Sequence, residues 1–381
     1  MALNSSTPVA LWVVPVPEFG GVARHVVDVA AAGLPGYELV VLAPSGHLTD
    51  ELKKMGVRIL TEVPFGVDAG FKKSFDALNI AIESEKPAVV HAHLAYADIV
   101  AAAVITSRKI KRVKNKALCV PALASTEHGI ADSGAVYNTN KLRALAMKTL
   151  HNLRLRVTDH KISVSASTSE QMAKQWGARE VEVVRNGIDV QGIQTAVAKM
   201  RTASDTNAPR LLSLSRLAPE KGLDYLIDAF ALLAQKYPQA HLEVAGAGEL
   251  EAELKMQVNN LSIAEAVSFP GFVNPLEAMG RADIIVQLSM WENLSYTLLD
   301  AKAAGLKVLA TDVGGNREIV GEEELAAPLE SHKDRQEQIR TLARALEKLW
   351  SSPQILDGAP TYSREQMNQA IVQVYGKREK I

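Results

Sequence analysis

Short apolar runs alternate with amphipathic segments along most of the chain, and this alternation restricts the possible folds more than any other feature. A run of about 4–8 apolar residues indicates a buried strand, whereas apolar positions spaced three or four apart indicate a helix. In the first half, the expected strands are 10–16, 38–43, 57–60, 88–91, 117–125, 162–165 and 181–184, and the expected helices are 21–32, 50–55, 71–85, 97–108 and 141–154. This pattern predicts a parallel sheet with helices on both faces.

The same alternation resumes after a polar stretch at residues 202–209. Here the expected strands are 210–215, 241–245, 267–270, 284–288 and 307–311, and the expected helices are 222–236, 249–259 and 295–304. We therefore predict an α/β protein of two Rossmann-like domains. The predicted parts are an N-terminal domain over 1–190, a linker over 191–208, a C-terminal domain over 209–362 and a C-terminal helix in 363–381 that packs back toward the first domain. Ligands of such sheets bind beyond the carboxyl ends of the strands, so we expect the site in a cleft between the domains.

Composition excludes several classes of protein. The chain of 381 residues is 47% apolar, which is too much for a disordered protein, and its net charge of −1 argues against a nucleic-acid binder. The single cysteine, Cys119, cannot form an intramolecular disulfide and is expected to be an inert core residue. The apolar run 95–106 is shorter than the roughly 20 residues of a membrane span, and no signal peptide is visible. We expect a cytoplasmic protein.

Charge is distributed unequally between the two halves. Residues 1–190 hold 22 Lys and Arg against 18 Asp and Glu, whereas the remainder holds 20 against 25. The basic residues gather in two segments and comprise Arg108, Lys109, Lys111, Arg112, Lys114 and Lys116, followed by Arg143, Lys148, Arg154 and Arg156. This asymmetry suggests an anionic partner for the N-terminal half, although charge runs are also typical of solvated helix faces.

A pair of glycines, Gly20 and Gly21, lies between the first expected strand and the first expected helix. Glycines let backbone N–H groups approach a ligand closely, and the N-terminus of the following helix favours an anion. The alternative interpretation is an ordinary tight turn.

Two cations follow the first strand of the second domain. Arg216 and Lys221 lie in a Pro-containing loop that opens a helix. A guanidinium and an ammonium that converge there suit a diphosphate group. The alternative is two solvated charges on a surface loop.

Acidic residues flank the start of a later helix. Glu292 precedes it and Asp300 lies two turns inside it, so both can accept hydrogen bonds from hydroxyl groups, while the backbone N–H groups of Asn293, Leu294 and Ser295 can face an anion. Alternatively, Ser295 is simply a helix N-cap and Asp300 an ordinary helix acid.

Signals for a metal site are weak. His128 follows a buried strand at the end where catalytic groups tend to lie. His91 and His93 alternate along one strand, but no third ligand is apparent, and the chain contains no Asp-x-Asp pair. Gly246-Ala247-Gly248 lacks a third glycine and is interpreted as a plain turn. We expect no bound metal and no cofactor.

Taken together, these segments resemble the family-4 glycosyltransferases, which are retaining enzymes with the two-domain GT-B fold. The matching segments are residues 20–25, 90–93, 126–129, 184–189, 215–222, 244–248, 269–273 and 313–318. Their order and spacing cover about 300 residues. The resemblance implies a hexosyltransferase of glycan biosynthesis that uses a nucleoside-diphosphate sugar without a metal ion.

The resemblance also implies roles for individual residues. Arg216 and Lys221 would bind the leaving diphosphate, Glu292 the donor sugar, and Asp300 the ribose hydroxyls, with His128 beside the reacting centre. Backbone groups would complete the donor site: Gly20 and Gly21 near the phosphates, and Phe272 and Val273 at the base. Two features depart from the family pattern. Asp300 replaces the usual Glu, and Asn293-Leu294-Ser295 replaces a Gly-Phe-Gly type of loop.

Mechanism and acceptor are less defined by the sequence. Retention is consistent with front-face attack, with Glu292 as a covalent nucleophile as the competing mechanism. The family binds acceptors on the N-terminal domain, so the basic segments suggest an anionic or lipid-linked acceptor and peripheral contact with the inner face of a membrane. Alternative functions are a sugar-nucleotide epimerase or phosphorylase, a non-catalytic nucleotide-sugar-binding protein, and an NAD-dependent oxidoreductase, which the incomplete glycine fingerprint disfavours.

Overall fold

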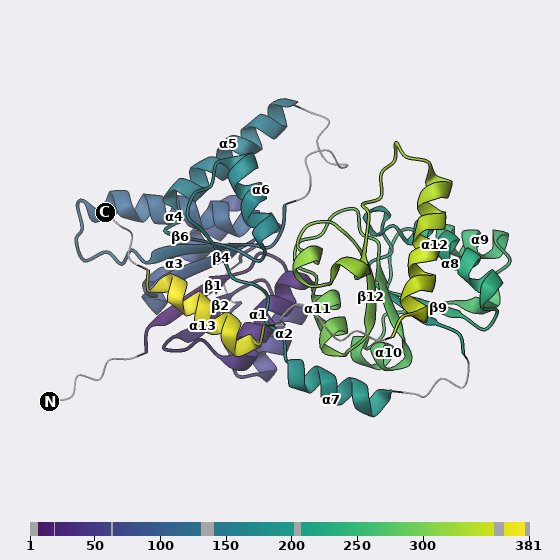
Figure 1. Cartoon of the computed structure of the whole chain (residues 1–381). Helices are drawn as coiled ribbons and strands as arrows, with labels where there is room; N and C mark the ends of the chain where they lie inside the picture. Colours follow the sequence, from purple (N-terminus) through teal and green to yellow (C-terminus); the bar gives the residue numbers. More distant parts are fainter. Residues whose placement is uncertain are drawn as a thin grey trace. The chain divides into compact units, whose positions relative to one another are not determined.

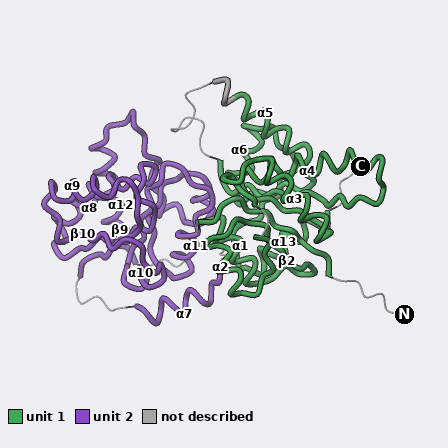
Figure 2. Tube along the Cα trace, turned by 180° about the vertical axis from the view of Figure 1, so that it is seen from behind, with its two compact units in different colours: residues 1–187, 362–381 green, residues 188–361 purple. Residues whose placement is uncertain are grey.

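The structure, a computed structural model, describes residues 7–18, 20–61, 64–130, 141–201, 207–353 and 362–377. The chain divides into two compact units (Figure 2). Unit 1 consists of residues 1–187 and 362–381, and unit 2 consists of residues 188–361.

Unit 1 is built on a seven-stranded sheet in which every pair of neighbours is parallel. Its strands are β1 (Val9–Val13), β2 (Glu38–Leu42), β3 (Arg58–Leu60), β4 (Val89–His93), β5 (Ala122–Glu127), β6 (His160–Ser163) and β7 (Val181–Val183), in the spatial order β3-β2-β1-β4-β5-β6-β7. Its helices are α1 (Gly21–Ala32), α2 (His47–Lys54), α3 (Phe71–Glu85), α4 (Ala95–Arg112), α5 (Lys141–Val157), α6 (Ala166–Trp176) and α13 (Arg364–Tyr375). All five residues of β4 are buried, as expected for a central parallel strand that is covered on both faces.

Unit 2 repeats this architecture with a six-stranded parallel sheet. The strands are β8 (Arg210–Leu214), β9 (His241–Ala245), β10 (Val267–Gly271), β11 (Ile284–Gln287), β12 (Lys307–Thr311) and β13 (Leu325–Ala326), in the order β10-β9-β8-β11-β12-β13. The helices are α7 (Val190–Met200), α8 (Leu223–Lys236), α9 (Glu251–Asn260), α10 (Pro275–Arg281), α11 (Tyr296–Ala303) and α12 (Arg335–Ser351). Short 3-10 turns lie at Pro219–Lys221, Ala264–Ala266, Asn316–Glu318 and Glu322–Glu324. The two α/β sheets have the architecture that the sequence predicted.

The C-terminal helix α13 lies beside α1, although the two are far apart in the sequence (Figure 1). Arg364 donates to the buried Asp28 carboxylate at 2.6 Å, and the Asn368 side-chain amide donates to the backbone carbonyls of Val29 at 2.9 Å and Gly33 at 2.6 Å. Tyr375 accepts a hydrogen bond from the Trp12 indole at 3.1 Å. These contacts explain why the end of the chain belongs to unit 1.

The predicted linker, residues 191–208, differs from the structure. Most of it forms α7, which packs against α10 and α11 within unit 2. The helix is stabilised at its start by Asp189, whose carboxylate accepts the Gly192 N–H at 2.8 Å, and it buries Ile193 and Val197. The polar residues after Met200 favoured a linker over the whole segment in the sequence. Residues 202–206 lie outside the described part of the chain.

Helix α5 exposes several apolar side chains. Leu145 is 63% exposed and Leu153 52% exposed, and Leu150 is exposed as well, whereas the buried polar residues of the helix include Arg154. The first turns of α5 extend beyond the rest of unit 1 (Figure 1). These three leucines therefore lie on the surface, whereas Leu155 of the same helix is buried.

Candidate functional site

The strand order reverses once in each sheet, and these switch points locate the candidate sites. In unit 1, β1 and β4 are neighbours whose chain connections run in opposite directions, and β8 and β11 have the same relation in unit 2. Open α/β sheets bind ligands outside the carboxyl ends of the strands at such points. Gly20 and Gly21 follow β1 and His93 ends β4, whereas Arg216 and Lys221 follow β8 and Glu292 follows β11.

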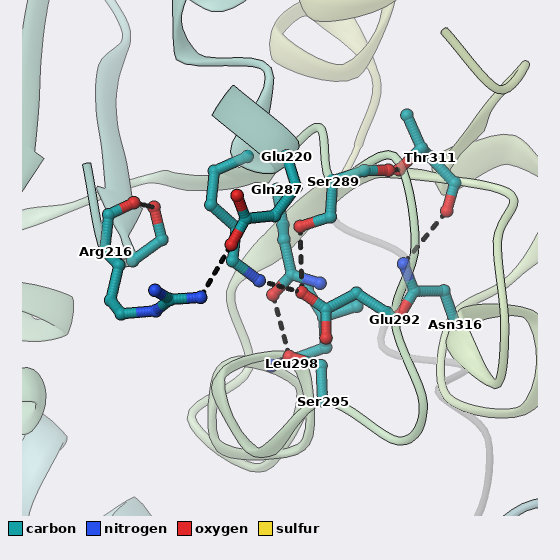
Figure 3. A network of polar contacts seen from close by, with 11 residues as sticks. Arg216, Glu220, Gln287, Ser289, Glu292, Ser295, Leu298, Thr311 and Asn316 are labelled. Carbon is teal, nitrogen blue, oxygen red and sulfur yellow. Dashed lines mark hydrogen bonds and ion pairs between the residues drawn. The ribbon is translucent and has the colours of Figure 1, made fainter. Parts of the chain in front are cut away.

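Figure 3 shows the polar network at the switch point of unit 2. Lys221 forms an ion pair with Glu292, and the same carboxylate oxygen accepts a hydrogen bond from the Ser289 hydroxyl at 2.8 Å. Arg216 pairs with Glu220 at 2.6 Å. Lys221 is 19% exposed and its pair with Glu292 is half-buried, whereas Arg216 is 71% exposed and its guanidinium can move to a ligand at little cost.

A second layer of hydrogen bonds fixes the loop that carries Glu292. The Thr311 hydroxyl at the end of β12 donates to the Ser289 carbonyl at 2.5 Å, and the Asn316 amide donates to the Thr311 carbonyl at 2.9 Å (Figure 3). The Gly315 N–H donates to the Asn293 carbonyl at 2.6 Å. All these residues lie at the carboxyl edge of β11 and β12, so the site is preorganised by its own sheet.

Glycines allow the loops of unit 2 to approach each other closely. A Cβ at Gly314, where φ is +55°, would lie 1.8 Å from the Glu292 carbonyl oxygen. A Cβ at Gly246 would lie 1.9 Å from the Ser215 carbonyl oxygen, and one at Gly248 would lie 2.3 Å from that of Leu217. The segment Gly246–Gly248, interpreted from the sequence as a plain turn, therefore supports the loop that carries Arg216.

The remaining candidate residues of unit 2 differ in how far they are buried. Ser295 is the N-cap of α11: its hydroxyl accepts the Leu298 N–H at 3.4 Å and donates to Gln287 at 2.7 Å, which is the structural role left open by the sequence. Asp300 is only 4% exposed on α11, and Leu294 is buried just before that helix. Phe272, in contrast, is 88% exposed just after β10, with Val273 half-buried.

His128 of unit 1 is half-buried and lies against two buried imidazoles, those of His25 and His93. Its Nε2 lies 2.9 Å from Nδ1 of His93, and its ring lies against that of His25 at a centroid distance of 4.8 Å. Burial lowers the pKa of His25 to about 4 and holds the pKa values of His93 and His128 well below the usual range. The rings are therefore neutral at pH 7. His91, which the sequence paired with His93, instead bonds to Tyr375 at 2.6 Å and Thr126 at 2.7 Å.

A buried charge network supports the backbone on both sides of His128. Arg154 of α5 pairs with Asp98 of α4 and, at 2.7 Å, with Glu127 of β5, whose carboxylate also accepts the Gly129 N–H. All three charged side chains are buried. With one cation between two acids, desolvation raises the pKa of Asp98 to about 7, and it also raises the pKa of Glu127.

The basic segments of unit 1 are less exposed than their sequence suggests. Arg108 is buried and bonds to Glu83, Asn79 and the Cys119 carbonyl, each at 2.7 Å. Arg154 is buried in the network described above. These two arginines of the basic segments are therefore not available to the anionic partner that the sequence suggested. Lys111, Arg112, Lys114, Lys116, Lys148 and Arg156 are exposed.

Sequence reasoning missed four residues near the two switch points. Thr311 gave no local signal, because its partner Ser289 follows a neighbouring strand. Ser289 bonds to Glu292 three residues later in the same loop, so its spacing from Glu292 is a local signal. His25 was part of a matched segment but was not singled out, and it reaches the other imidazoles only through the packing of α1 on the sheet. Glu127 adjoins His128, so its position alone could have marked it as a support.

Comparisons with known proteins agree with this architecture. The profile described as Glycosyltransferase Family 4 matches residues 19–191, and that described as Glycosyl transferases group 1 matches residues 196–364. Glycogen synthase of Mycobacterium tuberculosis is 26% identical over 339 residues, which are 81% of this chain and 78% of that protein. A phosphatidylinositol N-acetylglucosaminyltransferase component of Arabidopsis thaliana is 23% identical over 380 residues, 94% of this chain and 76% of that protein.

Solved structures show the same fold. Anabaena HepE, solved in complex with UDP and glucose, superimposes with a TM-score of 0.70 at 20% identity, covering 97% of this chain and 99% of that one. A glycosyltransferase from Rickettsia africae gives a TM-score of 0.68 at 17% identity, covering 97% and 98%. The two family profiles together match most of both units, and both units are parallel sheets with loops at a switch point. The chain therefore belongs to the family-4 glycosyltransferases and has the two-domain GT-B fold.

Proposed function

We propose that this glycosyltransferase moves a hexosyl group from a nucleoside-diphosphate sugar to an acceptor hydroxyl, with retention of configuration and without a metal ion. The observation that carries the proposal is the position of Arg216 and Lys221, two cations in the loop after β8 where the strand order of unit 2 reverses. Cleavage of the bond to the nucleotide builds negative charge on the diphosphate, and preorganised cations stabilise that charge.

In this reaction the acceptor oxygen forms a bond to the anomeric carbon as the bond from that carbon to the phosphate oxygen breaks. The acceptor proton passes to the departing phosphate oxygen, so the products are a glycoside and a nucleoside diphosphate. Lys221 and Arg216 leave their carboxylate partners for the phosphates, and Glu292 is then available to a donor-sugar hydroxyl. The paired state keeps Lys221 in position before the donor binds.

The contacts of Glu292 favour a binding role over a nucleophilic one. One oxygen of its carboxylate accepts the Ser289 hydroxyl, and this contact remains when Lys221 turns to the phosphates. A hydrogen-bond donor draws electron density from a carboxylate and so weakens it as a nucleophile. It also fixes the position of the carboxylate, which suits a hydrogen bond to a sugar hydroxyl. This supports front-face attack over a covalent glycosyl-enzyme.

We also propose that Gly20 and Gly21 of unit 1 contact the phosphates of the donor. A side chain at either position would meet no described atom within 4 Å, so packing within the described chain does not account for glycine there. Close approach of a ligand to the backbone, at the N-terminus of α1, does account for it. We also propose that His128 contacts the donor sugar, Asp300 the ribose, and the exposed Phe272 and neighbouring Val273 the base.

A thermal-shift panel of UDP, GDP, ADP and NAD tests the donor class, and UDP comes first because HepE was solved with it. A nucleoside diphosphate should raise the Tm of the wild type by mass action, and Arg216→Ala should reduce the shift. Arg281→Ala is the matched control, because Arg281 is an exposed arginine of unit 2 that precedes β11 and pairs with Glu243. The proposal would be refuted if NAD alone raised the Tm, or if none of the three nucleoside diphosphates raised it.

Product analysis separates transfer from the alternative reactions on this fold. A transferase needs an acceptor and releases a nucleoside diphosphate, whereas an epimerase needs no acceptor and a phosphorylase needs free phosphate. The anomeric proton signals of the product distinguish retention from inversion.

The acceptor side is proposed to lie on unit 1 and to contact an anionic membrane surface that carries a lipid-linked acceptor. The exposed turns of α5 combine Leu145, Leu150 and Leu153 with Lys148 and Arg156. Apolar side chains beside exposed cations suit an anionic lipid surface. None of the helices in the described ranges is long and apolar enough to cross a membrane.

Pelleting with vesicles that contain anionic lipid tests this contact. The triple variant Lys111→Glu, Arg112→Glu and Lys116→Glu, and separately Leu145→Ser with Leu153→Ser, should reduce pelleting several-fold. Lys109 is left unchanged because it pairs with Asp159. Pelleting that is the same for both variants and the wild type would exclude the membrane contact.

A further inference from the structure

Three imidazoles from different elements of unit 1 converge on one point. His25 lies on α1, His93 is the last residue of β4, and His128 follows β5. One ring nitrogen from each lies within 4.8 Å of the other two, and no other set of three or more such ligands occurs in the described part of the chain. Three properties of these nitrogens suit a metal ion: their tautomers, their charge and their number.

The tautomer of His25 presents a free lone pair. Its Nδ1 lies 3.2 Å from the carbonyl oxygen of the Asn186 side chain, and because that oxygen only accepts, Nδ1 carries the proton. The lone pair is then on Nε2, which is buried and has no hydrogen-bond partner among the described residues. A carbonyl that fixes the distal ring nitrogen is the usual second contact of a metal-bound histidine. Nε2 of His93 is likewise buried without a described partner.

The electrostatic state of the cluster suits metal binding. Histidine binds metals in its neutral form, and burial lowers the pKa of each ring so that all three are neutral at pH 7. The proton shared between Nδ1 of His93 and Nε2 of His128 must move to the other nitrogen of its own ring when an ion binds, but no net proton has to be released. Imidazole nitrogens prefer Zn²⁺, Cu²⁺, Ni²⁺ or Co²⁺, whereas Mg²⁺ and Ca²⁺ require oxygen ligands. Three histidine ligands leave a fourth position open to water or an anion.

Binding requires a small contraction of the cluster. Zn–N bonds of about 2.0–2.1 Å in a tetrahedral site place nitrogens roughly 3.4 Å apart. His93 and His128 already approach to 2.9 Å through their Nδ1 and Nε2 atoms, so the main movement is between this pair and His25. His128 is half-buried and follows the end of β5, so it is the ligand with most freedom to adjust.

We propose that His25, His93 and His128 form a binding site for a divalent transition-metal ion, and that its occupation inhibits sugar transfer. The inhibitory part rests on the proposed function, because it assumes that His128 contacts the donor sugar; the binding part does not. A metal ion that takes the His128 lone pair removes this contact and places two positive charges at the site.

Binding is tested on the full chain with Co²⁺ and Zn²⁺ alone, in the absence of any sugar nucleotide. Co²⁺ should give the intense visible absorption of a tetrahedral site at one equivalent, and Zn²⁺ should displace it. His128→Gln, at the half-buried position, and His25→Asn should each weaken Zn²⁺ binding at least 100-fold. His332→Asn, at an exposed histidine of unit 2, is the matched control and should change affinity less than twofold.

Asn186→Ala tests the supporting carbonyl and should weaken binding about 10–100-fold. Circular dichroism and Tm establish that each variant is folded. Stoichiometric Zn²⁺ binding that survives in folded His128→Gln, or a Co²⁺ spectrum typical of the hexaaqua ion, would overturn the site.

Inhibition is tested after treatment with a chelator. The treated wild type should transfer sugar, added Zn²⁺ should inhibit it at the concentration that fills the site, and His25→Asn should resist that inhibition. If Zn²⁺ binds as described but transfer is unaffected, the inhibitory part fails alone. If chelated wild type shows no transfer with any donor, the proposed function fails whereas the metal site stands.

Discussion

Lys221 and Glu292 form an ion pair across 71 residues of sequence, which brings the loop after β8 to the loop after β11. Glu292 is also held by Ser289, so the carboxylate lies in a fixed position with a cation beside it. The pair therefore combines two groups that would bind a nucleotide sugar: a cation for the phosphate and a hydrogen-bond acceptor for a sugar hydroxyl.

Replacing either partner should have a different kinetic effect. Lys221→Ala should lower kcat by about 10²–10³-fold, because the lost charge acts mainly on the leaving diphosphate. Glu292→Gln keeps the size of the side chain and should raise KM for the donor sugar as well as lowering kcat. Steady-state kinetics with the donor identified by thermal shift give both values. A Lys221→Ala variant with wild-type kcat would remove Lys221 from the reaction, and Arg281→Ala should be unaffected.

Gly314→Ala should inactivate the protein through Glu292. The new Cβ would lie 1.8 Å from the Glu292 carbonyl oxygen, and φ of +55° disfavours a side chain, so the backbone of the Glu292 loop must move. We expect at least a tenfold loss of kcat/KM and a lower Tm. Gly321→Ala is the control, because its φ is −73° and its Cβ would meet only the end of a flexible side chain at 4.0 Å. Equal activities of the two variants would contradict the predicted movement.

Asp98 should make the protein less stable as pH rises toward neutrality. Its pKa is about 7 in the folded protein and roughly 3.9 when unfolded, so its protonated form stabilises the fold at low pH and this contribution is lost between about pH 4 and 7. Asp98→Asn cannot ionise. The stability of Asp98→Asn relative to wild type should therefore increase with pH by about 1.4 kcal/mol per unit and become constant above about pH 7.

The measurement is Tm against pH for Asp98→Asn, with Asp50→Asn, an exposed acid on α2, as the control. A Tm difference between Asp98→Asn and wild type that is independent of pH would show that Asp98 is ionised throughout.

The imidazole cluster of His25, His93 and His128, together with the neighbouring His91, should make the fold less stable in acid. The pKa values of His25, His91, His93 and His128 are lowered in the folded state, so their contribution to stability is present above pH 6.5 and is lost as pH falls toward the folded pKa values. Each can contribute up to about 1.4 kcal/mol per pH unit, and together they outweigh the opposite effect of Asp98.

We expect Tm to fall steeply below about pH 6. His25→Asn should flatten this dependence, whereas His332→Asn should leave it unchanged because that side chain is 77% exposed. Identical Tm profiles for wild type and His25→Asn would show that His25 takes no part in acid unfolding.

Local pattern was sufficient for much of the fold. Helices α1 and α3 and strands β9 and β12 begin and end at the predicted residues, because their apolar periodicity is bounded by Gly, Pro or polar residues. Pattern failed where neighbouring signals were weak. The pattern does not predict helix α6, although Ser165 caps it and Gly177 ends it, and it predicts a linker where the structure has α7.

The sequence by itself determined that the chain forms alternating strands and helices, and that Arg216, Lys221 and His128 follow strands, because these depend on periodicity and on the position of a residue in its own segment. Only the tertiary structure decided their partners. Arg154 and Arg156 lie two residues apart on α5, yet one is buried between two acids and the other is exposed. His25 reaches His93 only because α1 packs over β4. Burial and pairing depend on which strands become neighbours, and that order is set by packing of the whole sheet.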